Sequence, residues 1–313
     1  MSRHVVFGTG QVGHPVVERL AVLGHDVVAV NRSGHGRPTD FRVVGGDATD
    51  PAFTTAVCSG ADVVYFCLNA MSYERWDDEF PPLQRGVLAG GRGARLVVLD
   101  NLYAYGRPHG QDLVETLPTR PTSTKSATRA AMTAELLDAH ARGRVEVVIG
   151  RASDYFGPGT TRSALGETVF AAALRGRTAQ VMGDPDQLHS YSYTPDVASA
   201  LVTLGSAAEA AGEIWPLPVA TPRTTPQIIE LVYDRADRRP RTLAAGPTTL
   251  RLLGLVKPAM REYLHTLYQF TERWVVDDSK FRAAFGDLPT PLGRAVDTTL
   301  EWYRAAATQR ATA

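Results

Sequence analysis

The sequence predicts an α/β protein in which a doubly wound parallel sheet is joined to a smaller C-terminal lobe. Three observations lead to this fold class. Short β-branched apolar runs alternate with helix-length segments through the first 150 residues, and a glycine-rich turn joins the first strand to the first helix. The regular alternation ends after "FGPGTTRS" at 156–163. Strands that alternate with helices in this way form a parallel sheet covered on both faces.

The composition is that of an ordinary globular protein. The chain has 313 residues, of which 44% are hydrophobic and 21% charged, and its formal net charge is zero. Without a basic block we expect no nucleic-acid partner, and without a long apolar run we expect no membrane span. Cys58 and Cys67 lie in or beside apolar stretches and form no metal-like cluster, so we expect buried thiols, no metal site and a cytoplasmic protein.

The first unit of the chain, "HVVFGTGQVGHPVVERLAVLGHDVVAVNRSG", is read as strand, turn, helix and strand. Gly8, Gly10 and Gly13 have G-x-G-x-x-G spacing, with Gln11 and Val12 between the last two. In such a turn the first glycine allows a tight bend, the second lets a pyrophosphate approach, and the third lets helix and strand pack closely. Free N–H groups at the helix start favour the phosphates. The unit therefore predicts a Rossmann-like dinucleotide site.

The end of the second strand indicates which nucleotide is bound. An NAD site usually has an acidic residue there to hold the ribose 2′-hydroxyl, but this chain has "VNRSGHGR". Arg32 or Arg37 can pair with a 2′-phosphate, which predicts NADP(H), with NAD(H) as the alternative. The other interpretation is that these arginines belong to a solvated loop.

Further strands follow in order. "RVVGGDATD" (42–50) contains a third strand ending at Asp47, which is placed to bond an adenine edge, and "ADVVYFCLNA" (61–70) a fourth. A helix within 75–90 is expected to start or break near Pro81 and Pro82, and strands at 94–101 and 144–154 flank another helix. Ligands of such sheets bind at the carboxyl ends of the strands. The segments predicted to face the pocket are therefore 69–71, 101–105 and 153–156.

The remainder of the chain mixes helices, such as "ALGETVFAAALRG" and "PQIIELVYDRA", with short strands and proline-rich turns. We expect a dinucleotide-binding domain at 1–155 that also includes about 190–220. The smaller substrate-binding lobe is expected at 156–189 and 221–313, without a linker between the two.

Several segments together resemble the short-chain dehydrogenase/reductase superfamily, in its extended and atypical branch of NAD-dependent epimerases and dehydratases. "GTGQVG" resembles the nucleotide turn, "GDATD" the adenine loop, and "LVVLDNLYAYG" the strand that carries a catalytic Ser or Thr. "IGRASDYFGPG", "HSYSYTPDVASAL", "GEIWPLP" and "PLGRAVDTTLEWYR" resemble later segments in the correct order. The resemblance covers nearly the whole chain.

The resemblance implies hydride transfer at the nicotinamide, with a Tyr-x-x-x-Lys pair as the proton-transfer group. That pair falls on Lys125 and Arg129, and the Ser/Thr position falls on Asn101, so all three familiar residues are missing. One interpretation places Lys125 and Arg129 on the surface of a helix. The other makes Lys125 the proton donor, with its pKa lowered by cationic neighbours, as in isoflavone-reductase-like relatives. Tyr103 or Asn101 would hold the substrate oxygen, although aromatic packing and a simple strand-to-loop turn are their alternatives.

The remaining contacts follow from the same resemblance. Those expected at the cofactor are Gly8, Gly10, Gln11, Val12, Gly13, Arg32, Asp47, Ala48, Leu68, Asn69, Lys125 and Tyr155. Those expected at the substrate are Met71, Tyr73, Tyr103, Tyr155, His189 and Tyr191.

Three functions stay open on the sequence. The first is an NADP(H)-dependent reductase of a small carbonyl or unsaturated metabolite, with Lys125 in place of the tyrosine. The second is an epimerase, isomerase or lyase of a sugar or secondary metabolite that retains its nucleotide. The third is a non-catalytic redox-sensing protein of the NmrA-like type. The resemblance also implies a homodimer formed through the helices near 74–90 and 124–141.

Overall fold

A seven-stranded parallel sheet forms the centre of the molecule. The computed structural model describes all residues except 37–40, 257–258, 288 and 313. The strand order is β11-β6-β5-β4-β1-β2-β3. The strands span Arg3–Phe7 (β1), Asp26–Asn31 (β2), Arg42–Gly45 (β3), Val63–Phe66 (β4), Arg95–Asp100 (β5), Glu146–Arg151 (β6) and Ile214–Pro216 (β11). The predicted doubly wound Rossmann-like sheet is confirmed.

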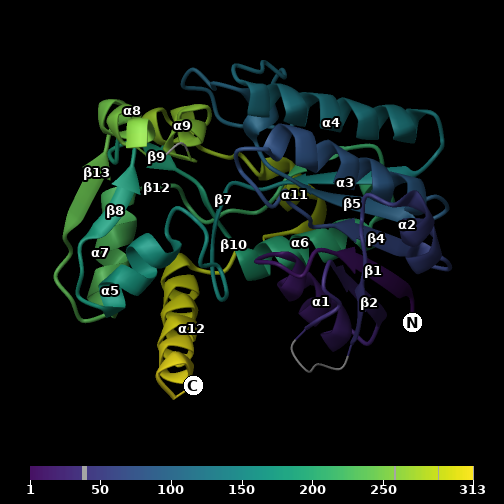
Figure 1. Cartoon of the computed structure of the whole chain (residues 1–313), viewed down its shortest axis with the longest axis horizontal. Helices are drawn as coiled ribbons and strands as arrows, with labels where there is room; N and C mark the ends of the chain where they lie inside the picture. Colours follow the sequence, from purple (N-terminus) through teal and green to yellow (C-terminus); the bar gives the residue numbers. More distant parts are fainter. Residues whose placement is uncertain (37–40, 257–258, 288, 313) are drawn as a thin grey trace.

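Helices cover both faces of this sheet (Figure 1). One face carries α1 (Gly13–Val22), α6 (Thr194–Ser206) and α11 (Ser279–Phe285), and the other carries α2 (Pro51–Cys58), α3 (Trp76–Gly90) and α4 (Thr124–Ala141). The strands alternate between the two cores: Val6 packs in the first, whereas Val5 and Phe7 pack in the second. This alternation follows from the period of two in a β-strand.

The chain order reverses at the centre of the sheet. From β1 it runs outward through β2 and β3, and then returns to β4 on the other side of β1 and continues through β5 and β6. In an open α/β sheet this switch point leaves a crevice at the carboxyl ends of the strands, and ligands bind there. The crevice expected here lies between the ends of β1 and β4.

The second part of the chain packs at one end of the sheet around its own core (Figure 1). Its strands pair in small sheets, β8 with β13, β9 with β12, and β10 with β7. The strands span Asp154–Phe156 (β7), Ala179–Met182 (β8), Leu188–His189 (β9), Tyr191–Tyr193 (β10), Arg223–Thr224 (β12) and Thr242–Ala245 (β13). The helices span Ala172–Leu174 (α5), Thr225–Arg235 (α7), Pro247–Val256 (α8), Ala259–Leu264 (α9), Tyr268–Thr271 (α10) and Leu292–Thr312 (α12).

Three local expectations differ from the structure. Helix α3 neither starts nor breaks at Pro81 and Pro82, since it runs through both from Trp76. Each proline lacks the N–H that would bond the carbonyl four residues earlier, and the packing of α3 tolerates this loss. The segment 166–171 is a π-helix rather than an α-helix. The third strand ends at Gly45, so Asp47 lies in the loop that follows it.

The helices of the described part of the chain include none with the length and apolar character of a membrane span.

Candidate active site at the carboxyl edge of the sheet

The glycine turn has the geometry that a dinucleotide requires. Gly8 has a φ of +96°, and a Cβ built on it would lie 2.6 Å from the carbonyl oxygen of Cys67 at the end of β4. A Cβ on Gly13 would lie 1.8 Å from the carbonyl oxygen of Gly8, so α1 packs directly on the turn. A Cβ on Gly10 meets nothing within 4 Å. Two glycines are thus required by close packing, whereas Gly10 faces open space, the position at which a pyrophosphate is expected.

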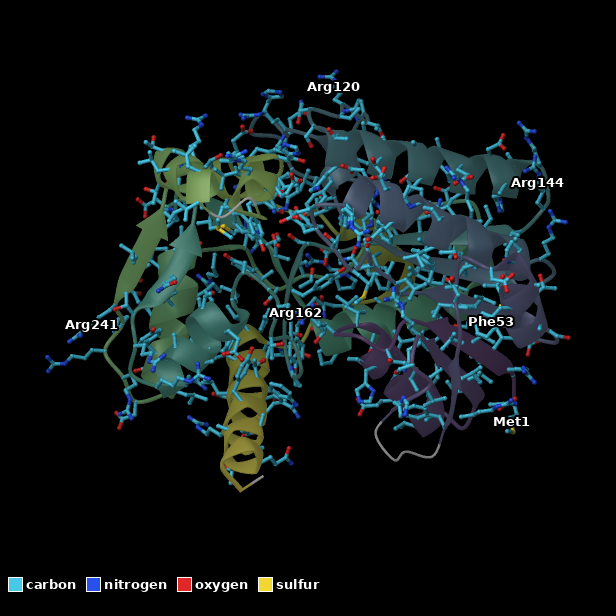
Figure 2. The ribbon with its side chains drawn as sticks, in the orientation of Figure 1. Met1, Phe53, Arg120, Arg144, Arg162 and Arg241 are labelled. Atoms are coloured by element: carbon cyan, nitrogen blue, oxygen red, sulfur yellow. The ribbon has the colours of Figure 1, made fainter. Side chains whose placement is uncertain are left out.

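The start of α1 leaves backbone donors for such a ligand. Its N-cap residue, Val12, is buried and makes no side-chain capping hydrogen bond. The neighbouring Gln11 is held by the second part of the chain, because its Oε1 accepts a 3.0 Å hydrogen bond from the backbone N–H of Arg162. Figure 2 labels Arg162 between the two parts of the chain. The helix dipole and the free N–H groups favour phosphate at this point.

The end of β2 carries a polar loop. The amide of Asn31 donates to the hydroxyl of Thr9 at 3.0 Å and to the carbonyl of His35 at 2.8 Å, which folds the loop back on itself. Arg32 is exposed and contributes to the electrostatic environment of Asp47. Arg37, the other predicted arginine, lies outside the described residues. Among the described residues at the end of β2, Arg32 is therefore the cation that can pair with a 2′-phosphate.

The loop after β3 is held by Asp47. Its Oδ1 accepts 2.9 Å hydrogen bonds from the backbone N–H and the hydroxyl of Thr49, and these lower the pKa of Asp47. The next residue, Ala48, is buried, and its carbonyl lies against Gly86 of α3. Both bonds to Thr49 use Oδ1, so Oδ2 of Asp47 takes no part in this turn.

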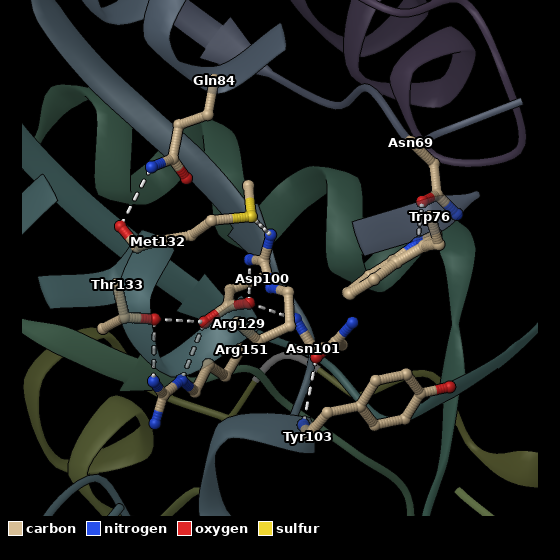
Figure 3. A network of polar contacts seen from close by, with 10 residues as sticks. All are labelled: Asn69, Trp76, Gln84, Asp100, Asn101, Tyr103, Arg129, Met132, Thr133 and Arg151. Carbon is tan, nitrogen blue, oxygen red and sulfur yellow. Dashed lines mark hydrogen bonds and ion pairs between the residues drawn. The ribbon is translucent and has the colours of Figure 1, made fainter. Parts of the chain in front are cut away.

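The loop after β4 contains Leu68 and Asn69. The Oδ1 of Asn69 accepts a 2.7 Å hydrogen bond from the indole N–H of Trp76 (Figure 3). It also accepts a 2.9 Å bond from the N–H of Ala70. Leu68 packs against the core that contains Trp76. Met71, a predicted substrate contact, is 70% exposed and points to solvent rather than into this packing.

Arg129, which the resemblance places at the family lysine, is buried inside the protein. Its guanidinium donates to the carboxylate of Asp100 at the end of β5, and Arg151 donates to the other carboxylate oxygen at 3.0 Å (Figure 3). Burial raises the pKa of Asp100, but the charges of Arg129 and Arg151 outweigh it and hold that pKa below its ordinary value. The guanidinium of Arg129 is therefore engaged inside the protein and cannot serve as a second proton-transfer group.

Lys125 is a buried cation. Its side chain is 0% exposed, and its Nζ donates at 2.8 Å to the carbonyl oxygen of Tyr73 and at 2.8 Å to Oε2 of Glu262 on α9. The ammonium also lies 4.6 Å from the centre of the Tyr73 ring and 5.9 Å from that of Trp76. The interpretation of Lys125 and Arg129 as solvated surface residues is wrong, because tertiary packing covers the first turns of α4.

Tyr103 is connected to Lys125 through Tyr73, and Asn101 holds the turn that carries Tyr103. The Oδ1 of Asn101 accepts a 3.0 Å hydrogen bond from the N–H of Tyr103, which fixes the turn after β5 (Figure 3). The hydroxyls of Tyr103 and Tyr73 are hydrogen-bonded to each other, and that of Tyr73 lies 3.0 Å from the hydroxyl of Thr266. Burial raises the pKa of both phenols, so both stay protonated near neutral pH and can act as hydrogen-bond donors.

A second polar group borders the site. The Nε2 of His189 lies 2.9 Å from Oδ2 of Asp154, and its Nδ1 lies 3.1 Å from the carbonyl oxygen of Gln269. Tyr191 is buried beside His189, with ring centres 4.5 Å apart. Burial raises the pKa of Tyr155 and of Tyr191, and the Asp154 charge contributes to both effects. Asp154 therefore sits among the tyrosines that were expected at the substrate.

The structure brings together residues that the sequence did not associate. Glu262, Asp154, Gln269 and Trp76 contact the expected site residues but carry no local motif. Glu262 lies 137 positions after Lys125, and only the packing of α9 over α4 brings the two together. Asp100 is the exception, since an acidic residue directly before Asn101 at the end of a buried strand is a visible signal in the sequence.

Family models match two consecutive parts of the chain. A model described as NAD(P)H-binding matches residues 8–94, and the model of the NAD dependent epimerase/dehydratase family matches residues 87–217. These matches contain the glycine turn, Asn101, Lys125 and Asp154. The NAD(P) cofactor expected from the glycine turn is thereby supported.

Curated relatives are similar over most of the chain. A dTDP-6-deoxy-L-talose 4-dehydrogenase (NAD(P)(+)) from Kitasatospora kifunensis is 26% identical over 249 residues, which are 74% of this chain and 78% of the relative. A UDP-glucose 4-epimerase from Mycolicibacterium smegmatis is 25% identical over 236 residues, 66% of this chain and 74% of the relative.

A solved structure with the same fold is the UDP-glucose 4-epimerase of Thermus thermophilus in complex with NAD. Its TM-score is 0.77 at 21% identity, and the superposition covers 97% of this chain and 99% of that one. At this identity the likeness establishes the fold of the chain.

Proposed function

Because the chain belongs to the short-chain dehydrogenase/reductase superfamily, in its NAD-dependent epimerase/dehydratase group, we propose that it reduces the ketone of a small hydroxylated metabolite with NADP(H). The observation that carries the proposal is the buried ammonium of Lys125, at the position where the family has its proton-transferring tyrosine. Relatives named as a 4-dehydrogenase and a 4-epimerase support a secondary alcohol or ketone as the reacting group.

The donors of Lys125 fit this role. An ammonium has three N–H groups, and within the described residues two acceptors lie at hydrogen-bond distance, the carbonyl of Tyr73 and the carboxylate of Glu262. The third N–H would bond the substrate oxygen, and the substrate must enter past the rings of Tyr73 and Trp76, which cover the ammonium. The chain contains three lysines among its 33 basic residues. Lysine differs from arginine in that it can give up its proton in a protein, so the residue type at 125 matters.

The neighbouring groups would orient the substrate. The protonated hydroxyl of Tyr103 and the amide of Asn101 can donate to the carbonyl oxygen, while Lys125 transfers the proton that the oxygen finally carries. When bound, NADPH supplies the hydride. Gly10 and the start of α1 would hold its pyrophosphate, and Arg32 its 2′-phosphate.

The test is the pair Lys125→Ala and Lys280→Ala. Lys280 is the matched control, because it forms an ion pair with Glu213 away from this site. Turnover would be followed by the absorbance of the reduced nicotinamide, on a panel of ketones and alcohols that begins with dTDP-6-deoxy-L-talose and UDP-glucose. We expect Lys125→Ala to lower kcat about 10²- to 10⁴-fold while the Kd of NADPH changes little. Undiminished turnover in Lys125→Ala would rule out this role.

A nucleotide-retaining 4-epimerase is the second candidate, favoured by the similarity to the mycobacterial UDP-glucose 4-epimerase. It differs from the reductase in one observable. Net reduction converts NADPH stoichiometrically with product, whereas epimerisation leaves the cofactor in its starting redox state. Product formation without a net absorbance change would therefore favour the epimerase.

We also propose that two copies pair through α3 and α4, which lie side by side on the outside of one sheet face (Figure 1). Light scattering after size-exclusion chromatography gives the mass directly. A mass of one chain across the working concentration range would contradict the homodimer.

A further inference from the structure

Lys125 has no direct access to water. Its side chain is 0% exposed, and it lies below Tyr73 and Trp76. Any proton that Lys125 gives to a substrate must therefore be replaced through a neighbouring group. Besides donating a proton, Lys125 must therefore be reprotonated after each turnover.

Two carboxylates of the described chain lie near the ammonium. Glu262 accepts from Nζ at 2.8 Å and its side chain is 24% exposed. The Oδ2 of Asp77 lies 4.0 Å from Nζ, beyond hydrogen-bond distance, and its side chain is 25% exposed. Glu262 thus touches both the sealed amine and the solvent, and a hydrogen-bonded route from Lys125 passes through it.

We propose that Glu262 is a positioning residue that relays protons between solvent and Lys125. The inference rests on the proposed function and deepens it. In reduction the carbonyl carbon gains the hydride of NADPH, and its oxygen gains a proton from the Lys125 ammonium. The Glu262 carboxylate, which then faces a neutral amine, takes up a proton from water and passes it to that amine, and this restores the ion pair. The sum is ketone, NADPH and one proton giving alcohol and NADP⁺.

The relay distinguishes the two candidate functions. Net reduction consumes one solvent proton in every turnover, so a sealed lysine needs a path to water. An epimerase returns to the substrate the proton that it removed, and its base can stay sealed. A solvent-linked carboxylate on the lysine therefore favours net redox chemistry over epimerisation.

The experiment measures proton exchange at Lys125 in the whole protein without cofactor or substrate. With ¹⁵N-labelled lysine the spectrum contains only residues 125, 257 and 280, and the Lys125 signal is identified by its loss in Lys125→Arg. The exchange rate of the Lys125 ammonium protons with water is compared in the wild type, Glu262→Gln and Glu262→Asp. Glu135→Gln is the matched control, because it removes a carboxylate from the Arg85 ion pair on the outer surface.

We expect Glu262→Gln to slow the exchange about ten-fold or more, since the amide keeps the hydrogen bond but cannot carry a proton. Glu262→Asp should recover part of the rate, and Glu135→Gln should leave it unchanged. An unchanged rate in Glu262→Gln would overturn the proposal. A faster rate would also overturn it, because Glu262 would then shield Lys125 from water. Slower exchange in Asp77→Asn alone would also overturn it by moving the route to Asp77.

The outcome is independent of the proposed reaction. If the exchange depends on Glu262 but no ketone is reduced by any variant, the relay stands and the reductase function fails. If Lys125→Ala abolishes reduction while Glu262→Gln leaves the exchange unchanged, the function stands and the relay fails.

Discussion

The guanidinium of Arg129 donates to the carboxylate of Asp100, and both side chains are about 1% exposed. The resemblance to short-chain dehydrogenases places Arg129 where those enzymes have the lysine that assists a catalytic tyrosine. Here the cation is turned to the end of β5, where Asp100 also binds Arg151 at 3.0 Å. We therefore expect Lys125, and not Arg129, to be the proton-transferring cation of this helix, because a guanidinium keeps its proton and that of Arg129 is bound to Asp100.

Replacing Asp100 with asparagine should strongly destabilise the fold, because two buried guanidinium groups would lose their shared carboxylate. We expect the free energy of unfolding to fall by about 3–5 kcal/mol in urea titrations. Asp138→Asn is the control, since it breaks the exposed ion pair with Arg142 and should change stability by less than about 1 kcal/mol. Equal effects of the two substitutions would mean that the buried Asp100 carboxylate stabilises the fold no more than an exposed ion pair does.

Two glycines of the nucleotide turn should respond in opposite ways. Gly13→Ala places a methyl group 1.8 Å from the Gly8 carbonyl oxygen and should disrupt folding of the turn, whereas Gly10→Ala meets no protein atom within 4 Å. We therefore expect Gly10→Ala to keep the wild-type melting temperature but to weaken NADPH binding about ten-fold or more, because the methyl group occupies the pyrophosphate space. Fluorescence titration measures the binding, and wild-type affinity in Gly10→Ala would contradict this assignment.

The sequence predicted the sheet and the turn because both depend on local periodicity. Gly8, Gly10 and Gly13 have fixed spacing, and β-branched runs mark the strands. Helix α3 was misjudged at Pro81 and Pro82 because the packing of its apolar residues outweighs two missing hydrogen bonds.

The covering of Lys125 could not be predicted from the sequence. Glu262 and Lys125 meet through long-range packing of α9 on α4, and no periodic pattern relates residues so far apart. For the same reason the contact of Asp154 with His189 was missed, although both segments were expected near the pocket. Local rules thus predict the expected cofactor half of the candidate site, whereas its expected substrate half depends on tertiary contacts.

Arg32 should determine the preference between the two nicotinamide cofactors. Arg32→Ala removes the described cation beside Asp47, so the Kd of NADPH should rise about ten-fold while that of NADH stays nearly constant. Arg42→Ala is the control, because this exposed arginine begins the neighbouring strand β3, at the amino end of the strands and away from the carboxyl end of β2. Equal loss of both cofactors in Arg32→Ala would assign the residue a role in the loop rather than at the 2′-phosphate.

His4 should make stability depend on pH in mildly acidic solution. Burial and, to a smaller extent, the neighbouring His25 lower its pKa to about 4, and Asp62 partly opposes them. Its Nε2 lies 2.7 Å from the Ser2 hydroxyl, which also bonds His25. Above about pH 6.5 the ring is neutral in both folded and unfolded chains, so it adds no pH dependence there. Below that pH the unfolded chain takes up a proton that the folded chain refuses until about pH 4.

The free energy of unfolding should therefore fall on this account by about 2 kcal/mol between pH 7 and pH 5. Urea titrations at several pH values measure it. His4→Phe keeps a ring in the strand and removes the titrating group, so its profile should be flatter over this interval. His109→Asn is the control at an exposed histidine with a φ of 50°, a conformation that asparagine tolerates. A wild-type slope in His4→Phe would assign the acid sensitivity to other groups.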